Sequence, residues 1–274
     1  MGQGGASATL PVAELHSPVA PPGMNRTMHE TTVRDLSGKT ALVTGGGTGI
    51  GLGIARALAA AGCRTGIGGR RDDVLQEAVA NTSDAASLQT HVVDVADRAS
   101  VSAFVHWGRE ALGPVDILVN AAGINIKTRS MAEMTPAQWD QIIAVNLTGA
   151  YNLMHAVLPD MRQRGSGFIV HINSIAGVIF NPIAGIAYTA SKWGMTGLVS
   201  AVAEEEEAHG IRITSICPGE VETPLLDQRP VEVGPERRAM ILQPEDLAEV
   251  VVTLARMPSR VQVPELVIRP LERR

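Results

Sequence analysis

Residues 39–51 read KTALVTGGGTGIG, a short apolar run that ends in a cluster of glycines. The apolar run predicts a buried strand, and the Ala-rich stretch after the glycines predicts a helix over residues 49–61. Glycines in such a turn let backbone N–H groups and the positive helix end face a pyrophosphate, because no Cβ stands in the way. A tight turn with a purely structural role is the alternative. The dinucleotide-binding residues expected here are Thr44, Gly45, Gly47, Thr48, Gly49, Ile50 and Gly51.

Strand and helix patterns continue to alternate after this turn. Further apolar strands are expected at residues 64–68, 88–93, 115–119, 167–172, 211–216 and 265–268. Further helices are expected at residues 72–80, 98–112, 136–162, 188–209 and 244–255. Strands that are apolar throughout and separated by helices indicate a parallel sheet covered on both faces. The expected fold class is therefore α/β, a Rossmann-type doubly wound parallel β-sheet with helices on both faces.

The overall composition limits the kinds of partner. The chain has 274 residues, of which 45% are hydrophobic and 3% aromatic, and its formal net charge is −5. An acidic chain with few aromatic rings is unsuited to nucleic acid or an anionic membrane surface. No window offers about 18 uncharged apolar residues, so no membrane span is expected. We expect a small-molecule substrate, with no nucleic-acid partner and no membrane.

The first 35 residues differ from the rest of the chain. They are rich in Gly, Pro, Ser, Thr and Ala and have no lasting apolar period, which predicts a disordered N-terminal tail. Pro11 and Glu14 interrupt any apolar run of the signal-peptide kind. Residues 36–274 are expected to form a single dinucleotide-binding domain. The two cysteines, Cys63 and Cys217, suit a reducing compartment, and a cytoplasmic location is expected.

The end of the second expected strand carries basic residues where an acidic residue is usual. In dinucleotide-binding folds, an acidic side chain about 20 positions after the glycine turn holds a ribose 2′-hydroxyl. Here the sequence reads Gly69-Arg70-Arg71-Asp72, and arginine offers a planar donor fork to a 2′-phosphate. Arg70 and Arg71 therefore favour NADP, with NAD as the alternative. In the structural alternative, both arginines are solvated and Asp72 caps the next helix.

A tyrosine and a lysine stand one helical turn apart in the segment Tyr188-Thr189-Ala190-Ser191-Lys192. Residues four apart share a helical face, so these two side chains can act together. A phenol with a pKa of about 10 is a poor base at neutral pH, and a nearby ammonium lowers that pKa. The phenol can then give a proton to a carbonyl oxygen or take one from an alcohol. Ser174 follows a strand and can hold the same oxygen through a hydrogen bond.

Together, these motifs resemble those of the short-chain dehydrogenase/reductase family, in its compact single-domain branch. The resemblance covers about residues 36–270, and Thr44-Gly45-x-x-x-Gly49-x-Gly51 is similar to the cofactor loop of the family. The other segments that match the family pattern are Asp94-Val95, Asn120-Ala121-Ala122-Gly123, Asn146 in Val145-Asn146-Leu147, Ser174, Tyr188 with Lys192, and Pro218-Gly219 with Val221 and Thr223.

The resemblance implies an NAD(P)-dependent oxidoreductase that transfers a hydride between nicotinamide and a ketone or secondary alcohol. Tyr188 is then the general acid/base, and Lys192 lowers its pKa and holds the nicotinamide ribose. Ser174 polarises the carbonyl, and Asn146 holds a water in the proton relay. NADPH-dependent carbonyl reduction is the expected direction, and NAD-dependent alcohol oxidation is the alternative. The resemblance also implies a homodimer or homotetramer and no metal.

Cofactor contacts are implied in the same way. Asp94 contacts adenine in relatives, Asn120 to Gly123 lie beside the adenosine ribose, and Thr223 bonds the nicotinamide carboxamide. Two other functional classes remain open on the same fold. One is a protein that binds or senses the cofactor without turnover, and the other is an isomerase or dehydratase that recycles its nucleotide.

The sequence also departs from the family pattern. The interval from Ser174 to Tyr188 is about one residue longer than in relatives, which we expect to reshape the substrate pocket. Glu220 and Glu222 make their segment unusually acidic, and solvent exposure is expected for both rather than contact with a cationic substrate.

Two further expectations concern loops and a charge run. Residues 124–131, 175–185 and 221–240 are expected to define the substrate pocket, with Ile179 and Phe180 in an apolar wall. Residues 204–207 are four consecutive glutamates, and neighbours on a helix point in different directions. They are expected to form a solvated helix face rather than a cation site.

Overall fold

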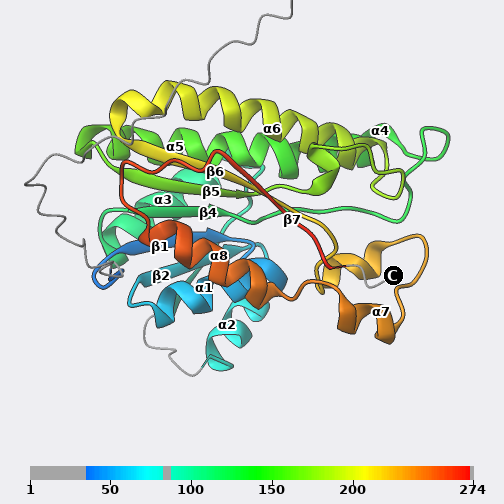
Figure 1. The fold of residues 1–274 in the computed structure, drawn as a ribbon, viewed down its shortest axis with the longest axis horizontal. Coiled ribbons are helices and arrows are strands. Elements are labelled where there is room, and N and C mark those ends of the chain that lie inside the picture. The colour runs from blue at the N-terminus through cyan, green and yellow to red at the C-terminus, as the bar shows by residue number, and fades with distance from the viewer. Residues whose placement is uncertain (1–34, 83–87, 272–274) are drawn as a thin grey trace, which may run out of the picture. The chain divides into compact units, whose positions relative to one another are not determined.

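The computed structural model describes residues 35–82 and 88–271, all of which belong to one compact unit. The expected N-terminal tail, apart from Asp35, lies outside the described residues. Seven parallel strands form one sheet in the order β3-β2-β1-β4-β5-β6-β7 (Figure 1). The strands are β1 Thr40–Thr44, β2 Arg64–Gly69, β3 Leu88–Val92, β4 Ile117–Asn120, β5 Gly167–Ile172, β6 Ile211–Pro218 and β7 Glu265–Ile268.

Helices connect the strands and cover both faces of the sheet (Figure 1). Those of the first half are α1 Gly49–Ala60, α2 Asp72–Ala80, α3 Arg98–Leu112, α4 Pro136–Ile143, the π-helical turn η2 Ala144–Thr148 and α5 Gly149–Arg164. Those of the second half are α6 Ile186–Glu206, α7 Pro235–Met240, α8 Pro244–Arg256 and the 3-10 turns η3 Ile175–Gly177, η4 Glu207–His209 and η5 Pro224–Gln228. The expected Rossmann-type doubly wound sheet is confirmed.

Two hydrophobic clusters fill the space between the sheet and its helices. On one face, Ile54 of α1 and Leu247 of α8 pack on the sheet and are fully buried. On the other face, Phe104 of α3, Leu153 of α5 and Val199 of α6 do the same. Each such side chain contributes roughly 1.5–3 kcal/mol through burial. The fold is therefore held by apolar contacts on both sides of the sheet, which leaves the ends of the strands free for polar groups.

The strand order reverses beside β1, which lies between β2 and β4. The register pairs Thr44 at the end of β1 with Gly68 of β2 and with Asn120 at the end of β4. In open parallel sheets, ligands bind in the crevice outside the carboxyl ends of the strands at this reversal. The glycine turn that follows Thr44 lies at that position.

Several helices differ from the expected ones. The helix expected over residues 136–162 is interrupted by the π-helical turn η2, and the short helix α7 was not expected. The helix expected at residues 188–209 begins earlier, at Ile186. Within the described part of the chain, Pro136–Arg164 is one stretch long and apolar enough to cross a membrane, but 56% of its most apolar window is buried inside the structure. This stretch packs on the sheet as a core helix.

Candidate active site

The glycine turn requires glycine at two positions because backbone atoms lie where a side chain would start. Gly45 has a φ of 66°, and a Cβ there would lie 2.9 Å from the backbone of Ala121. A Cβ at Gly51 would lie 2.2 Å from the carbonyl oxygen of Gly45. These contacts bring the start of α1 against the ends of β1 and β4, so the helix N-terminus faces the crevice.

A cavity of about 200 Å³ lies at this crevice. We call it the glycine-loop cavity. The predicted cofactor-binding residues in its wall are Gly45, Gly47, Thr48, Arg70, Arg71, Asp94, Val95 and Gly123. The wall also contains Ala122, from the expected segment at residues 120–123, and Ile124, which was expected in the substrate pocket. The residues that sequence reasoning missed are Gly68, Gly69, Val74, Leu75, Val93 and Val145. Three of these, Gly69, Val93 and Val145, are chain neighbours of predicted residues, and that adjacency was the available signal for them.

Arg70 and Arg71 are exposed at the edge of this cavity. Neither arginine forms an ion pair with any residue that the structure describes. Both arginines are thus solvated, as the structural alternative expects, but Asp72 is the first helical residue of α2 and Arg71 its N-cap residue, so the capping role expected for Asp72 is wrong. Two cationic side chains are thus available to an anionic group at the end of β2.

Other predicted cofactor residues lie outside the wall of the glycine-loop cavity. Thr44 donates from its hydroxyl to the Asn120 side-chain oxygen at 3.3 Å, which joins the ends of β1 and β4. Gly49 and Thr223 line a second cavity of about 290 Å³, and a Cβ at Gly49 would lie 3.0 Å from the Thr223 methyl carbon. The remaining predicted residues are Ile50 and Gly51 in α1, Ala121 after β4, Tyr188 and Lys192 in α6, and Pro218, Gly219 and Val221 at and after the end of β6.

Tyr188 and Lys192 lie one turn apart near the start of α6, as the spacing predicts. The Lys192 ammonium nitrogen is 5.6 Å from the Tyr188 ring centre and donates to the Ile172 carbonyl oxygen at 2.9 Å. Ser174 ends the loop after β5 and caps η3, because its hydroxyl accepts from the Ala176 N–H at 3.1 Å. The ends of β5 and α6 therefore bring the hydroxyl, the phenol and the ammonium group to one place.

Burial controls the protonation of these groups. Burial raises the pKa of Tyr188, while hydrogen bonding to Ser174 and the positive charge of Arg129 act in the opposite direction. Burial lowers the pKa of Lys192 to about 8, because the charged ammonium loses its hydration. The charged forms of the phenol and the amine are thus both disfavoured by burial, and they depend on the polar groups around them.

Asn146 lies in the π-helical turn η2 and is fully buried. Its side-chain oxygen accepts from the Ile124 N–H at 2.8 Å, and its amide nitrogen donates to the Ile124 carbonyl at 3.0 Å. A Cβ at Gly123 would lie 3.6 Å from the Asn146 oxygen and 4.0 Å from the Lys192 ammonium nitrogen. The backbone at Gly123 therefore connects the glycine-loop cavity with the side chains of Asn146 and Lys192.

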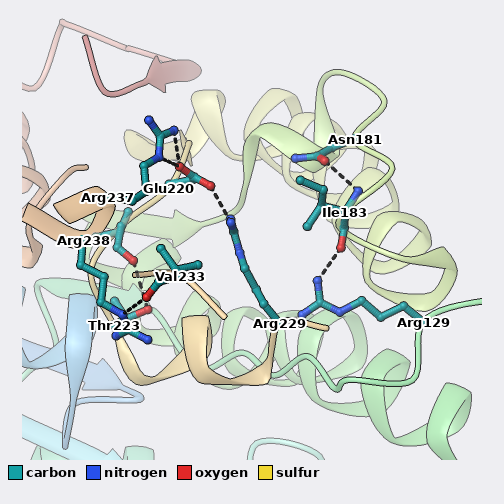
Figure 2. Close-up of polar contacts among 10 residues, drawn as sticks. Arg129, Asn181, Ile183, Glu220, Thr223, Arg229, Val233, Arg237 and Arg238 are labelled. Carbon is teal, nitrogen blue, oxygen red and sulfur yellow. Dashed lines mark hydrogen bonds and ion pairs between the residues drawn. The ribbon is translucent and has the colours of Figure 1, made fainter. Parts of the chain in front are cut away.

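The expectation that Glu220 and Glu222 are solvent-exposed is wrong. Glu220 is 23% exposed and accepts from Arg229 at 2.6 Å and from Arg237 at 2.9 Å (Figure 2). Burial raises its pKa, but the two arginines outweigh this and leave the pKa below its usual value. Glu222 accepts from Arg238 at 2.8 Å. Both carboxylates are neutralised within residues 220–238, so they do not offer a cation site.

The expected solvated face at residues 204–207 is only partly correct. Glu204, Glu205 and Glu207 are exposed, whereas Glu206 is fully buried. Its carboxylate accepts from the Arg162 Nε at 3.0 and 3.1 Å and also pairs with the terminal nitrogen of that arginine. This pair joins α6 to α5. No cluster of His, Cys, Asp or Glu that could hold a metal occurs among residues 35–82 and 88–271.

Comparison with known proteins assigns the family. The model of the short chain dehydrogenase family matches residues 39–232. The chain is 36% identical over 82% of its length to D-beta-hydroxybutyrate dehydrogenase of Cupriavidus necator, and the match covers 85% of that protein. It is 36% identical over 91% of its length to glycine betaine reductase ATRR of Emericella nidulans, of which it spans only 20%.

A solved structure agrees with this assignment. The crystal structure of a metagenomic short-chain oxidoreductase in complex with NADP superposes with a TM-score of 0.74 and 34% sequence identity. The superposition covers 88% of this chain and 100% of the metagenomic protein. The family match, the parallel sheet and the Ser174-Tyr188-Lys192 grouping lead to one conclusion: the chain belongs to the short-chain dehydrogenase/reductase family of oxidoreductases.

Proposed function

We propose that the chain is an NADP-preferring oxidoreductase that reduces a ketone to a secondary alcohol. The observation that carries this proposal is the position of Tyr188. Its phenol lies at the start of α6 with the Ser174 hydroxyl and the Lys192 ammonium beside it. The glycine-loop cavity adjoins them through Gly123. Proton transfer groups and a dinucleotide cavity are the two parts that a carbonyl reduction requires.

The residues divide the work as follows. Ser174 donates a hydrogen bond to the substrate carbonyl oxygen and fixes its position. Tyr188 donates a proton to that oxygen in reduction, and its phenolate takes the proton back in oxidation. Lys192 stabilises the phenolate of Tyr188. Asn146 belongs to the proton relay, and its side chain holds the backbone of Ile124. A reduced nicotinamide held in the glycine-loop cavity would supply the hydride for the carbonyl carbon.

The residues of the glycine-loop cavity fit a dinucleotide. Bare glycine backbone forms much of the wall, and the start of α1 presents the positive end of a helix to phosphate. Asp94 accepts from the Ala96 N–H through one oxygen, which leaves the other oxygen for the adenine amino group. We assign the 2′-phosphate to Arg70 and Arg71, and the metagenomic relative in complex with NADP supports this preference. NAD remains the alternative cofactor.

We assign the other cofactor contacts from the positions of the predicted residues around the glycine turn. Thr44 and Asn120 hold the ends of β1 and β4 together. Thr223 lies against Gly49, which brings the loop after β6 to the glycine turn. We assign the remaining contacts to Gly45, Gly47, Thr48, Ile50, Gly51, Val95, Ala121, Gly123, Tyr188, Lys192, Pro218, Gly219 and Val221.

We also propose that residues 36–274 work as a single domain in a cytoplasmic homodimer or homotetramer. Trp139, Tyr151 and Trp193 of α4, α5 and α6 are 38%, 42% and 47% exposed. Large apolar side chains on neighbouring helices favour contact with a second copy. Cys63 and Cys217 are both free and buried, which suits a reducing compartment.

The function is tested by the absorbance of NADPH in the presence of a panel of ketones, 3-oxo acids and aldehydes. We expect consumption of NADPH with at least one ketone, and faster consumption than with NADH. Product analysis then identifies the secondary alcohol. If the protein binds the cofactor but catalyses neither reduction nor oxidation, a binding or sensing role is favoured instead. Turnover of substrate with an unchanged nicotinamide absorbance favours an isomerase or dehydratase.

A further inference from the structure

Arg129 joins the three loops around the tyrosine site. It lies in the loop after β4, and its Nε donates to the Ile126 carbonyl of the same loop at 2.7 Å. One terminal nitrogen donates to the carbonyl of Ile183, before α6 (Figure 2). The other donates to the carbonyl of Gln228, at the end of η5, at 2.7 Å. One guanidinium group therefore holds segments that are 54 and 99 positions away in the chain.

The backbone of Arg129 is also tied to the helix that carries the tyrosine. The Ile186 N–H, at the start of α6, donates to the Arg129 carbonyl oxygen at 3.2 Å. A Cβ at Gly185 would lie 2.6 Å from the Arg129 Cβ, so the segments that contain Arg129 and Gly185 are in direct contact. Ile186 is two residues before Tyr188. The arginine is thereby held next to the first turn of α6.

The charge of Arg129 has no carboxylate partner in the part of the chain that the structure describes. Its three hydrogen bonds go to neutral carbonyl oxygens. Three carboxylates of the neighbouring loop are already paired with other arginines: Glu220 with Arg229 and Arg237, and Glu222 and Asp227 with Arg238. A partly buried cation without an anion is unfavourable unless an anion forms beside it.

The anion that can form beside Arg129 is the phenolate of Tyr188, and three polar groups interact with this phenol. Lys192 lies on the same helix, Ser174 follows β5, and Arg129 comes from the loop after β4. Lys192 in turn faces His171 of β5 and Cys217 of β6, and Arg129 faces Arg229.

Lys192 and Arg129 lose their positive charge at different pH values. Burial lowers the pKa of Lys192 to about 8, so this lysine loses its charge in mildly alkaline solution. Burial, and to a lesser extent the charge of Arg229, lower the pKa of Arg129, but the pKa of a guanidinium is ordinarily so high that the group keeps its proton. Arg129 is therefore a lasting positive charge beside the first turn of α6, the turn that contains Tyr188.

We propose that Arg129 is a positioning residue of the tyrosine site: it clasps the loop at residues 221–240 to the start of α6, and its unpaired charge favours the phenolate form of Tyr188. The proposal rests on the proposed function, because it takes Tyr188 as the proton-transfer group. It predicts two separable effects, one that depends on the charge of Arg129 and one that depends on its three-way hydrogen bonding.

The composition of the chain allows a direct test. Tyr151 and Tyr188 are the only two tyrosines, and Tyr151 is 42% exposed on α5. In a Tyr151→Phe background, the ultraviolet absorbance of phenolate reports on Tyr188 alone. A stopped-flow pH jump reads this absorbance before alkaline unfolding. We compare Arg129→Met, Arg129→Lys and the control Lys127→Met, which removes an exposed charge from the same loop.

We expect the midpoint of the Tyr188 phenolate titration to move to higher pH in Arg129→Met. In Arg129→Lys and Lys127→Met, this midpoint should stay near the value of the Tyr151→Phe parent. An unchanged midpoint in Arg129→Met, or an equal shift in Arg129→Lys and Arg129→Met, overturns the role of the charge. The titration uses no substrate, so loss of the proposed function and loss of this proposal are distinguishable.

The rate of limited proteolysis within residues 221–240 measures how firmly Arg129 holds this loop to the start of α6. Both Arg129 variants lose the three-way hydrogen bonding, so we expect cleavage of this loop to be about tenfold faster in both, because removal of such hydrogen bonds raises the open population by roughly that factor. Lys127→Met keeps the parent rate. Cleavage at the parent rate in both Arg129 variants overturns the clasp.

Discussion

Asn146 and Ile124 form a reciprocal pair, in which the asparagine side chain both accepts from and donates to one backbone unit, at 2.8 and 3.0 Å. The pair exists because the π-helical turn η2 points the Asn146 side chain back to the loop after β4. π-Helical turns inside longer helices are frequent at functional sites. This turn therefore fixes the distance between a long core helix and the loop beside the glycine-loop cavity.

Removal of that pair is expected to destabilise the protein and to lower turnover. Asn146→Ala leaves the partly buried N–H and carbonyl of Ile124 without side-chain partners, and an unpaired group costs up to about 1–3 kcal/mol, the value for full burial. Urea unfolding measures the loss of stability, and the NADPH assay measures the rate. Unchanged stability in Asn146→Ala contradicts the account of η2.

Cofactor preference is expected to depend on Arg70 and Arg71. Arg70→Ala and Arg71→Ala should each weaken NADPH binding about tenfold, because charge-assisted hydrogen bonds to the 2′-phosphate are lost. NADH binding, which involves no such phosphate, should remain unchanged and serves as the internal control. Fluorescence titration measures both affinities. Equal weakening of NADPH and NADH excludes the assignment of these arginines to the 2′-phosphate.

The glycine turn should not tolerate a side chain at Gly45. Gly45→Ala places a Cβ 2.9 Å from the Ala121 backbone at a φ of 66°, and such strain costs of order 1–3 kcal/mol. We expect lower stability and loss of NADPH binding. Gly197→Ala is the matched control, because nothing lies within 4 Å of its Cβ in the exposed face of α6. That variant should gain about 0.5–1 kcal/mol.

His171 should make the fold sensitive to acid. Burial first and the charge of Lys192 second lower the pKa of His171 to about 3, from an ordinary value of 6.5. Between these values the unfolded chain binds more protons than the folded chain, so stability falls as pH falls from 6.5 towards 3. The slope is at most about 1.4 kcal/mol per pH unit.

Urea unfolding from pH 7 to pH 4 measures this slope in the wild type and in His171→Asn. The variant lacks the titrating ring and should lose stability less steeply over the same range. A slope that is identical in the two proteins assigns the acid sensitivity to other groups.

The alternation of strands and helices could be predicted from the sequence because each element carries its own pattern. β5 at Gly167–Ile172, α2 at Asp72–Ala80 and α3 at Arg98–Leu112 agree with the expected ranges. The Tyr188–Lys192 spacing and the glycine turn are likewise local signals. These signals indicate Tyr188, Lys192 and the glycine-loop cavity without information on distant contacts.

The remaining features depend on partners far away in the chain. Glu206 is buried because Arg162, 44 positions earlier, meets it across two helices. Glu220 and Glu222 are neutralised by arginines that lie in and around α7, a helix of six residues too short to give a clear apolar period. The role of Arg129 required three loops to be placed in space. No local pattern contains that information.

The most direct test of the account compares the wild type with Tyr188→Phe in the NADPH assay, on whichever ketone the panel identifies. The phenylalanine keeps the ring and removes the hydroxyl that gives the proton. We predict that the rate falls by about 100-fold or more, the usual contribution of a general acid, while NADPH binding by fluorescence titration stays within about twofold. A rate in Tyr188→Phe equal to that of the wild type, at equal NADPH occupancy, contradicts the assignment of Tyr188 as the proton donor.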